Sequence, residues 1–230
     1  MRKVLIGTPC YDGRLDVWYT NSLTHTIKLS YEHNVEIVPI WLSFDALLQR
    51  ARNDTIDVML QDTFDDMIWI DSDIEWKPED FFKLLDYPVD VVGGTYRKKG
   101  DKEEYVVRQV EKRPKNELGL IPLDGLGTGF VRMSRVACQY LWDVSKPYID
   151  PKDGRERRMI FDVVVEDSQG IPSLISEDIH AFNKLTAGGY NIYLDPTIIC
   201  NHIGPYKFVG DARGFQNFLN RNSNFVKKQL

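Results

Sequence analysis

The chain has 230 residues, and its 43% hydrophobic and 27% charged content is typical of a folded protein whose core needs no disulfides. The formal net charge of -5 argues against a protein that binds nucleic acid through bulk attraction to phosphates. That charge still allows a local basic pocket for a single diphosphate.

The three cysteines, Cys10, Cys138 and Cys200, are far apart in the sequence and include no C-x-x-C pair. We therefore expect neither a zinc ribbon nor a disulfide framework, and reduced thiols in a cytoplasmic protein are the simplest interpretation. The N-terminal segment has only about six apolar residues after its basic pair, which is too short for a signal peptide. No apolar run approaches the roughly 18–20 residues of a membrane span, so we expect a soluble chain without one.

The first part of the chain alternates between strand-like and helix-like segments. Apolar and β-branched residues predict strands at residues 4–6, 35–40, 67–70 and 89–92. Helices are predicted at residues 16–33, at residues 44–52 with a continuation from residue 54, and at residues 79–85 after Pro78. Such alternation is typical of an α/β protein with a mostly parallel central sheet flanked by helices.

The second part of the chain has a more irregular pattern, which predicts a small antiparallel extension of the sheet. Strand-like pieces lie at residues 105–107, 120–121, 130–133, 159–165, 192–194 and 198–200. Helices are predicted at residues 134–142 and 176–186, which Ser134 and Ser176 would cap, and near the C-terminus. The sequence contains no internal repeat and no linker, so we expect one domain over residues 1–230.

Asp71-Ser72-Asp73 directly follows the predicted strand at residues 67–70. With 230 residues and this aspartate content, chance alone produces about two D-x-D pairs, so the motif depends on its context. In open α/β sheets, ligands bind at the carboxyl ends of the strands, and two carboxylates there can face one Mg²⁺ or Mn²⁺ ion. The alternative is an Asx-turn that ends the strand.

Two later segments also carry chemically useful side chains. Glu177-Asp178 begins a predicted helix, where acidic residues often only complement the helix dipole but could also supply a general base. His202 follows the last predicted strand and precedes Gly204. A histidine in this place is often a surface residue, but it could also complete a metal site.

The order of these segments resembles that of the GT-A glycosyltransferases, in particular the family 2-like members with a DxD motif. The resemblance extends from Gly7-Thr8-Pro9 to His202-Ile203-Gly204. It implies a GT-A (Rossmann-like) fold with a nucleotide-binding half at residues 1–100 and an acceptor and catalytic half at residues 101–230. It also implies that Asp71, Asp73 and His202 hold Mn²⁺ or Mg²⁺, and that Asp178, or failing that Glu177, is the catalytic base.

The resemblance assigns further residues to substrate binding. Thr8, Pro9, Tyr11 and Arg14 would form the nucleotide loop, Arg52 and Asn53 would contact the nucleotide, and Ser72 would lie beside it. Gly127, Thr128 and Gly129 would line the donor sugar and the acceptor, with Trp76 and Arg97 close by. The basic loop at residues 93–99 could cover the donor or acceptor, or could simply be solvated.

The implied reaction is transfer of a sugar from a nucleotide-diphosphate donor to a hydroxyl of a glycan or glycoprotein, with inversion. A UDP-sugar is favoured and a GDP-sugar is possible; no nucleic-acid partner is expected.

Three other classes compete with this interpretation. A haloacid-dehalogenase-like phosphatase also has a strand followed by DxD, but it needs Thr or Val where this chain has Glu75. A sugar-1-phosphate nucleotidyltransferase needs a Gly-rich basic signature that residues 7–14 lack. A carbohydrate-binding module could use the Trp and Tyr side chains for stacking, but an acidic metal cluster would have no role there.

Overall fold

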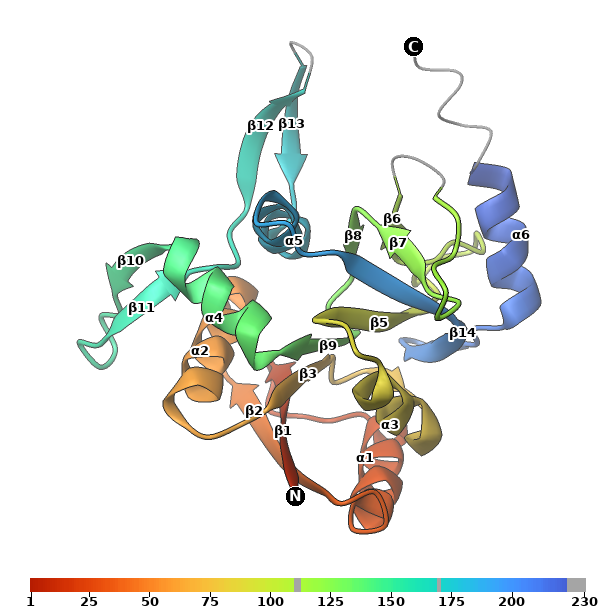
Figure 1. Ribbon diagram of the computed structural model, residues 1–230, viewed down its shortest axis with the longest axis horizontal. Coiled ribbons are helices and arrows are strands. Elements are labelled where there is room, and N and C mark those ends of the chain that lie inside the picture. Colours follow the sequence, from red (N-terminus) through yellow and green to blue (C-terminus); the bar gives the residue numbers. More distant parts are fainter. Residues whose placement is uncertain (110–112, 169–170, 223–230) are drawn as a thin grey trace.

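The structure is a computed structural model that describes residues 1–109, 113–168 and 171–222. Within these residues the main sheet has nine strands, and its path runs β15-β14-β5-β9-β3-β1-β2 (Figure 1). Five strands share one direction: β1 (Arg2–Cys10), β2 (Val35–Ser43), β3 (Asp66–Ile70), β5 (Val91–Tyr96) and β14 (Ile192–Ile203). β9 (Phe130–Ser134) runs antiparallel between β3 and β5. The predicted α/β class with a mostly parallel central sheet is confirmed.

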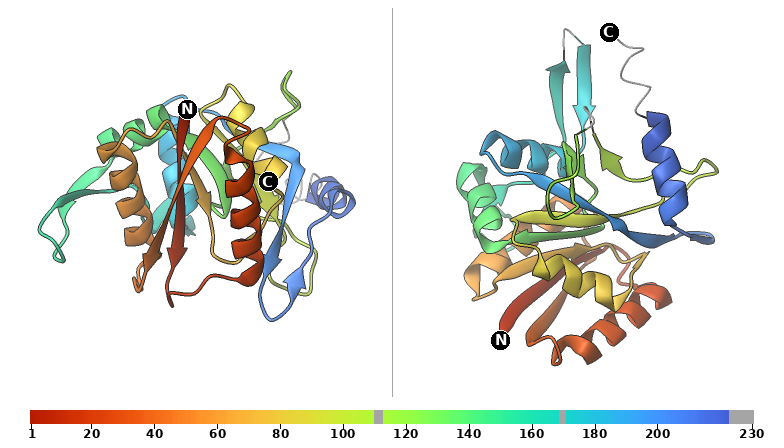
Figure 2. Two further views of the ribbon diagram at one scale, coloured as in Figure 1. Left: turned by 90° about the horizontal axis from the view of Figure 1, so that it is seen from below. Right: turned by 45° about the vertical axis from the view of Figure 1, so that its right-hand side comes forward.

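Helices cover both faces of this sheet, as the two directions of Figure 2 show. α1 (Val17–Ser30) and α3 (Pro78–Asp86) pack against each other on one face. On the other face α4 (Arg135–Val144) packs between α2 (Leu48–Gln61) and α5 (Glu177–Ala187). α6 (Ala212–Asn222) lies against β14.

The central strands are buried on both faces, which explains their continuous apolar sequences. In β3, Met67 and Trp69 join the core cluster under α2, α4 and α5. Ile68 and Ile70 point the opposite way, into the cluster under α1 and α3. Because successive side chains of a strand alternate between faces, one short strand contributes to both cores and its carboxyl end is held rigidly.

The later part of the chain extends the sheet with antiparallel strands. β4 (Ile74–Glu75), β7 (Ile121–Leu123) and β15 (Lys207–Phe208) all pair antiparallel with β14. A short pair, β6 (Val107–Arg108) with β8 (Gly125–Leu126), lies beside it. Two ribbons, β10 (Lys146–Ile149) with β11 (Glu156–Met159) and β12 (Val164–Ser168) with β13 (Ile171–Ile175), project from the body (Figure 1).

Several predicted elements differ from those observed. The strand predicted at residues 159–165 is wrong, because β11 ends at Met159 and β12 begins at Val164. Between them, the backbone N–H groups of Ile160 and Phe161 donate to the side chain of Asn53, at 3.1 and 2.9 Å, instead of joining a ladder. The strands predicted at residues 192–194 and 198–200 are parts of the single strand β14, which has an irregularity between Leu194 and Ile199.

The helix predicted from residue 44 begins only at Leu48, after Phe44 adopts a positive φ of 60°. In the parts of the chain that the structure describes, no helix has the length and apolar character needed to cross a membrane.

Candidate functional site

The segment Asp71-Ser72-Asp73 follows β3 at the carboxyl edge of the sheet and is held by three other elements. The Asp71 N–H donates to the carbonyl of Gly129 next to β9, at 3.2 Å. The Ser72 carbonyl accepts from the N–H of Asp16, the N-cap of α1, at 3.1 Å. The Asp73 carbonyl accepts from Ile203 of β14 at 2.8 Å. These backbone bonds fix the turn, so its side chains are presented from a rigid support.

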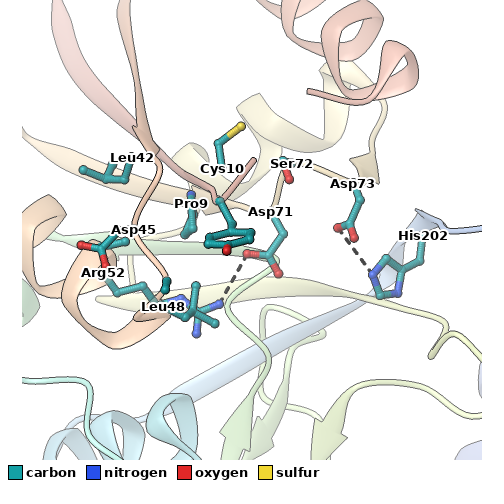
Figure 3. Close-up of a pocket in the computed structure, with 13 residues that line it drawn as sticks. Pro9, Cys10, Leu42, Asp45, Leu48, Arg52, Asp71, Ser72, Asp73 and His202 are labelled. Atoms are coloured by element: carbon teal, nitrogen blue, oxygen red, sulfur yellow. Dashed lines mark hydrogen bonds and ion pairs between the residues drawn. The ribbon is translucent and has the colours of Figure 1, made fainter. Parts of the chain in front are cut away.

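The turn forms one wall of a pocket of about 330 Å³ (Figure 3). Figure 3 shows Asp73 and His202 at one end of the pocket, the charged end, and Leu42, Leu48 and Asp45 at the other, with Asp71 and Arg52 between them. The rest of the lining is Pro9, Cys10, Tyr11, Ala46, Ala51 and Ser72. The pocket therefore combines apolar side chains with charged ones, as a site for a ligand with both apolar and charged parts requires.

Asp73 lies between His202 and Lys99. Its Oδ1 is 3.5 Å from Nε2 of His202, as Figure 3 shows, and its other carboxylate oxygen pairs with the Lys99 ammonium. Burial alone would raise the pKa of Asp73, but the hydrogen bonds from His202 and Lys99 outweigh it and hold the pKa below its usual range. Asp73 is therefore ionised at neutral pH.

His202 has its ring orientation fixed by the backbone. Its Nδ1 is 2.9 Å from the carbonyl of Arg97, and because a carbonyl only accepts, Nδ1 carries the proton of that hydrogen bond. When the ring is protonated, Nε2 donates toward the Asp73 carboxylate, whereas in the neutral ring Nε2 presents a lone pair toward it. Two acceptors that face each other need a proton or a cation between them, and this pair offers one nitrogen and one oxygen to such a cation.

Arg52 contacts one acidic residue from each part of the chain. Its guanidinium, on α2, donates to Oε1 of Glu177 at 2.7 Å and to Oδ1 of Asp71 at 3.4 Å. The side chain is only 5% exposed and its Nε has no hydrogen-bond partner in the described structure. Burial raises the pKa of Asp71, and the Arg52 charge opposes that rise. Arg52 therefore keeps two carboxylates close together at one end of the pocket.

The segment Gly127-Thr128-Gly129 packs against Tyr96. The Tyr96 hydroxyl accepts from the N–H of Gly129 at 3.2 Å. A Cβ at Gly127 or at Gly129 would lie within 2.6 Å of Tyr96 atoms, so both positions require glycine. Burial, and next the charge of Asp71, raise the pKa of Tyr96 well above its ordinary value, and Asp178 contributes to the rise. The charges of Asp71 and Asp178 therefore both act on Tyr96.

Thr128 is 1% exposed, and its hydroxyl has no hydrogen-bond partner among the described residues. A buried hydroxyl without a partner is costly unless a ligand or water satisfies it.

Glu177 and Asp178 begin α5 but have different partners. Glu177 is committed to Arg52. Asp178 Oδ1 accepts from the N–H of Ile179 at 2.7 Å and from the hydroxyl of Ser176, while Oδ2 takes part in neither bond. Ser176 precedes the helix as expected, but its hydroxyl donates to Asp178 rather than capping the helix N–H groups.

Some residues predicted for substrate binding have structural partners elsewhere. The Thr8 hydroxyl is fully buried and bonds to Tyr19 at 2.7 Å. Asn53 holds Ile160 and Phe161, and Trp76 lies in the core with its indole N–H on Thr26 at 3.0 Å. Arg14 is exposed and absent from the pocket lining. Arg97 contributes its backbone carbonyl, through His202.

The predicted basic loop at residues 93–99 is wrong for residues 93–96, which belong to β5. Tyr96, at the end of β5, and Lys99, in the turn that follows, both contribute to the site. Asp45 also lines the pocket and was not predicted, although its place just before α2 is a common one for a helix-start carboxylate.

Possible metal ligands are few. Among the residues that the structure describes, no group of three or more His, Cys, Asp or Glu side chains converges as a metal site. Asp71 turns toward Arg52, so the pair Asp73 and His202 is the part of the predicted triad that lies together. A hard cation that takes its remaining ligands from a phosphate needs only one or two protein carboxylates.

Comparison of the sequence with models of known protein families and with curated proteins finds no match. Among solved structures, the chain is similar in fold to the crystal structure of A197 from STIV. The TM-score is 0.55 at 17% sequence identity, and the likeness covers 89% of this chain and 86% of that chain. At this identity the likeness concerns the fold.

Proposed function

We propose that this protein is a metal-dependent glycosyltransferase of the GT-A type, which transfers a sugar from a nucleotide-diphosphate donor to a hydroxyl acceptor with inversion. The observation that carries the proposal is the pairing of Asp73 with His202 at the charged end of a pocket that is also lined by apolar side chains. A UDP-sugar is the favoured donor, with a GDP-sugar as the alternative, and a glycan or glycoprotein is the acceptor.

The pocket suits the donor in two ways. Tyr11 and the apolar side chains of the lining fit a planar base, since an aromatic side chain can stack on it. The charged end fits a diphosphate, because Arg52 and a cation held by Asp73 and His202 would offset its charge. Arg52 lines the pocket, and its unpaired Nε is a buried polar group for which a bound donor would supply a partner.

The residues present fit Mn²⁺ or Mg²⁺, because Asp73 offers an ionised carboxylate oxygen and His202 offers Nε2 with its other ring nitrogen held by a carbonyl. When bound, such an ion would act as a Lewis acid at the leaving diphosphate oxygens. Asp71 and Arg52 contact each other in the pocket, and the backbone hydrogen bond from Asp71 to Gly129 fixes the position of Asp71.

Asp178 is the proposed base that accepts the proton of the attacking hydroxyl. The bonds from Ile179 and Ser176 to Oδ1 orient its carboxylate, and Oδ2 is not part of them. Glu177 suits this role less well because its charge is already matched by Arg52 at 2.7 Å. Glu177 instead positions Arg52, which in turn contacts Asp71.

The test begins with a thermal-shift screen of nucleoside diphosphates in the presence of Mn²⁺, since a ligand that binds the folded state raises its melting temperature. Turnover is then measured with sugar donors that carry the nucleotide found in the screen. Asp178→Asn should lower this turnover by about 10²–10⁴-fold, the typical contribution of a general base, and leave nucleotide binding close to that of the wild type. Glu177→Gln is the control, since it should weaken folding more than it affects proton transfer. Wild-type turnover by Asp178→Asn would show that the base is elsewhere.

A further inference from the structure

Lys99 is the cation that faces the proposed metal site. It lies in an exposed turn after β5, in which the N–H of Lys98 donates to the carbonyl of Glu104 at 2.7 Å. The ammonium of Lys99 pairs with the Asp73 carboxylate on the oxygen that His202 does not approach. Its methylenes lie along Gly204, where an added Cβ would be 3.3 Å from the Lys99 Cδ.

This contact gives Asp73 a positively charged partner. Arg52 pairs with both Asp71 and Glu177, and Lys99 pairs with Asp73, so two cationic side chains face three carboxylates. A divalent cation on Asp73 and His202 would share one carboxylate with the ammonium. Like charges on either side of one small carboxylate repel, so the ammonium and the divalent ion compete for Asp73.

The ammonium can leave without a change in the backbone. The Lys99 side chain is 37% exposed, so a rotation of its flexible stem is enough to move the charge. The neighbouring backbone is anchored, because the Arg97 carbonyl holds His202 and Arg97 itself bridges to Tyr105. The displaced ammonium would remain beside the charged end of the pocket, where the diphosphate is proposed to lie.

We propose that Lys99 is a resident counter-ion of Asp73 that is displaced by the divalent cation and then binds the diphosphate of the donor. This inference rests on the proposed function. It makes Lys99 a binding residue that links the two ligands, because the cation releases the ammonium to which the diphosphate then binds. Lysine suits the second role because its ammonium has three donors and commonly binds phosphate as a point charge.

The inference predicts effects of opposite sign for the two ligands. Without nucleotide, Lys99→Met removes a competitor, so Mn²⁺ should bind about five- to tenfold more tightly, at the low end of typical coupling between two sites. With saturating Mn²⁺, the same variant lacks a charged contact to phosphate, so UDP should bind about tenfold more weakly. Lys98→Met is the matched control, because Lys98 pairs with Glu104 and should change either affinity by less than about twofold.

The experiment titrates Mn²⁺ into each protein and measures free Mn²⁺ by electron paramagnetic resonance. Calorimetry then measures UDP binding, and GDP binding in parallel, at saturating Mn²⁺. A second readout is the rate of amine acetylation at Lys99, measured by mass spectrometry, which should rise when Mn²⁺ is added to the wild type, while the rate at Lys98 should not change.

The outcomes separate the inference from the function on which it rests. Tighter Mn²⁺ binding together with weaker nucleotide binding in Lys99→Met supports the inference. Unchanged or weaker Mn²⁺ binding in that variant, with a wild type that binds both ligands, overturns the role of Lys99 and leaves the proposed function standing. A wild type that binds neither Mn²⁺ nor either nucleotide overturns the proposed function itself, and the inference with it.

Discussion

At the scale of single residues, the site depends on the pairing of buried charges. The Arg52 guanidinium reaches Glu177 and Asp71 with two different nitrogens, and it lies 5.9 Å from the centre of the Phe161 ring. This arrangement uses the planar fork of arginine, which lysine lacks. Loss of a buried partner is costly, because the remaining charge stays in a poorly solvated place.

We predict that Arg52→Met lowers the free energy of unfolding by about 3 kcal/mol, since it leaves two partly buried carboxylates facing each other. Arg52→Lys should recover part of this loss through its charge. Unfolding in urea measures both variants. Arg155→Met is the matched control, because Arg155 is 63% exposed and 3.9 Å from its partner Asp153. Equal stability of Arg52→Met and Arg155→Met would contradict the structural role of Arg52.

A second residue-scale prediction concerns the glycines of the inner wall. In Gly129→Ala the new Cβ would lie 2.6 Å from the Tyr96 ring, so the buried ring or the strand must shift. We expect a loss of about 1–3 kcal/mol in the free energy of unfolding, the usual cost of overpacking. Gly100→Ala is the control, because nothing lies within 4 Å of a Cβ there. If thermal or urea unfolding finds both variants equally stable, Tyr96 does not restrict this position.

The sequence predicts some of these residues and not others. Asp73 follows the buried strand β3, and the resemblance to the GT-A arrangement predicted that it meets His202. His202 was expected after the last strand but lies within β14, which extends to Ile203. The bond between Arg52 and Glu177 joins residues 125 positions apart, and no local pattern indicates it. The resemblance to the GT-A family assigned Thr8 and Asn53 to nucleotide binding. Only their partners, Tyr19 for Thr8 and the backbone of Ile160 and Phe161 for Asn53, show other roles.

At the scale of elements, α2 and α5 hold the irregular segment between β11 and β12. Asn53 of α2 accepts from the N–H groups of Ile160 and Phe161, and Lys184 of α5 donates to the carbonyls of Met159 and Ile160, at 2.7 and 2.8 Å. The apolar and β-branched composition of residues 159–165 favours a strand. Side chains from two distant helices take the hydrogen bonds that a strand would need, so tertiary contacts override the local preference.

The partly buried Lys184 leads to a prediction about pH. Burial lowers the pKa of Lys184 to about 8, whereas in the unfolded chain the side chain has the ordinary lysine pKa. Between these two pKa values the unfolded chain binds the proton more strongly than the folded chain does. Stability therefore rises with pH through this group, from about pH 8 to the ordinary lysine pKa near 10.4. The measurement is the free energy of unfolding across this range for the wild type and for Lys184→Met. Their difference should shift in favour of the wild type as pH rises, and a constant difference would contradict the assignment.

At the scale of the whole molecule, the two parts of the chain share one sheet. β9 and β14 come from the later part and pair with β3 and β5 of the first part. The alternation of strands and helices predicted the parallel portion of this sheet. It could not predict that β9 enters between β3 and β5 in the opposite direction, because an apolar strand does not specify its neighbours or their direction.

This arrangement places the site where the two parts of the chain meet. Asp71 and Asp73 follow β3, His202 lies on β14, and Gly129 beside β9 supports the turn between them. The pocket thus depends on the complete sheet. We propose that its charged end binds a nucleoside diphosphate together with a divalent cation.

Calorimetry of UDP and GDP binding, with Mn²⁺ and with a chelator in its place, tests this claim most directly. We predict that the wild type binds one of these nucleotides at least about tenfold more tightly with Mn²⁺, equivalent to about 1.4 kcal/mol. In Asp73→Ala, which removes the carboxylate beside His202, the affinity should be the same in both conditions. Equal affinity of the wild type with and without Mn²⁺ would contradict the metal-dependent site.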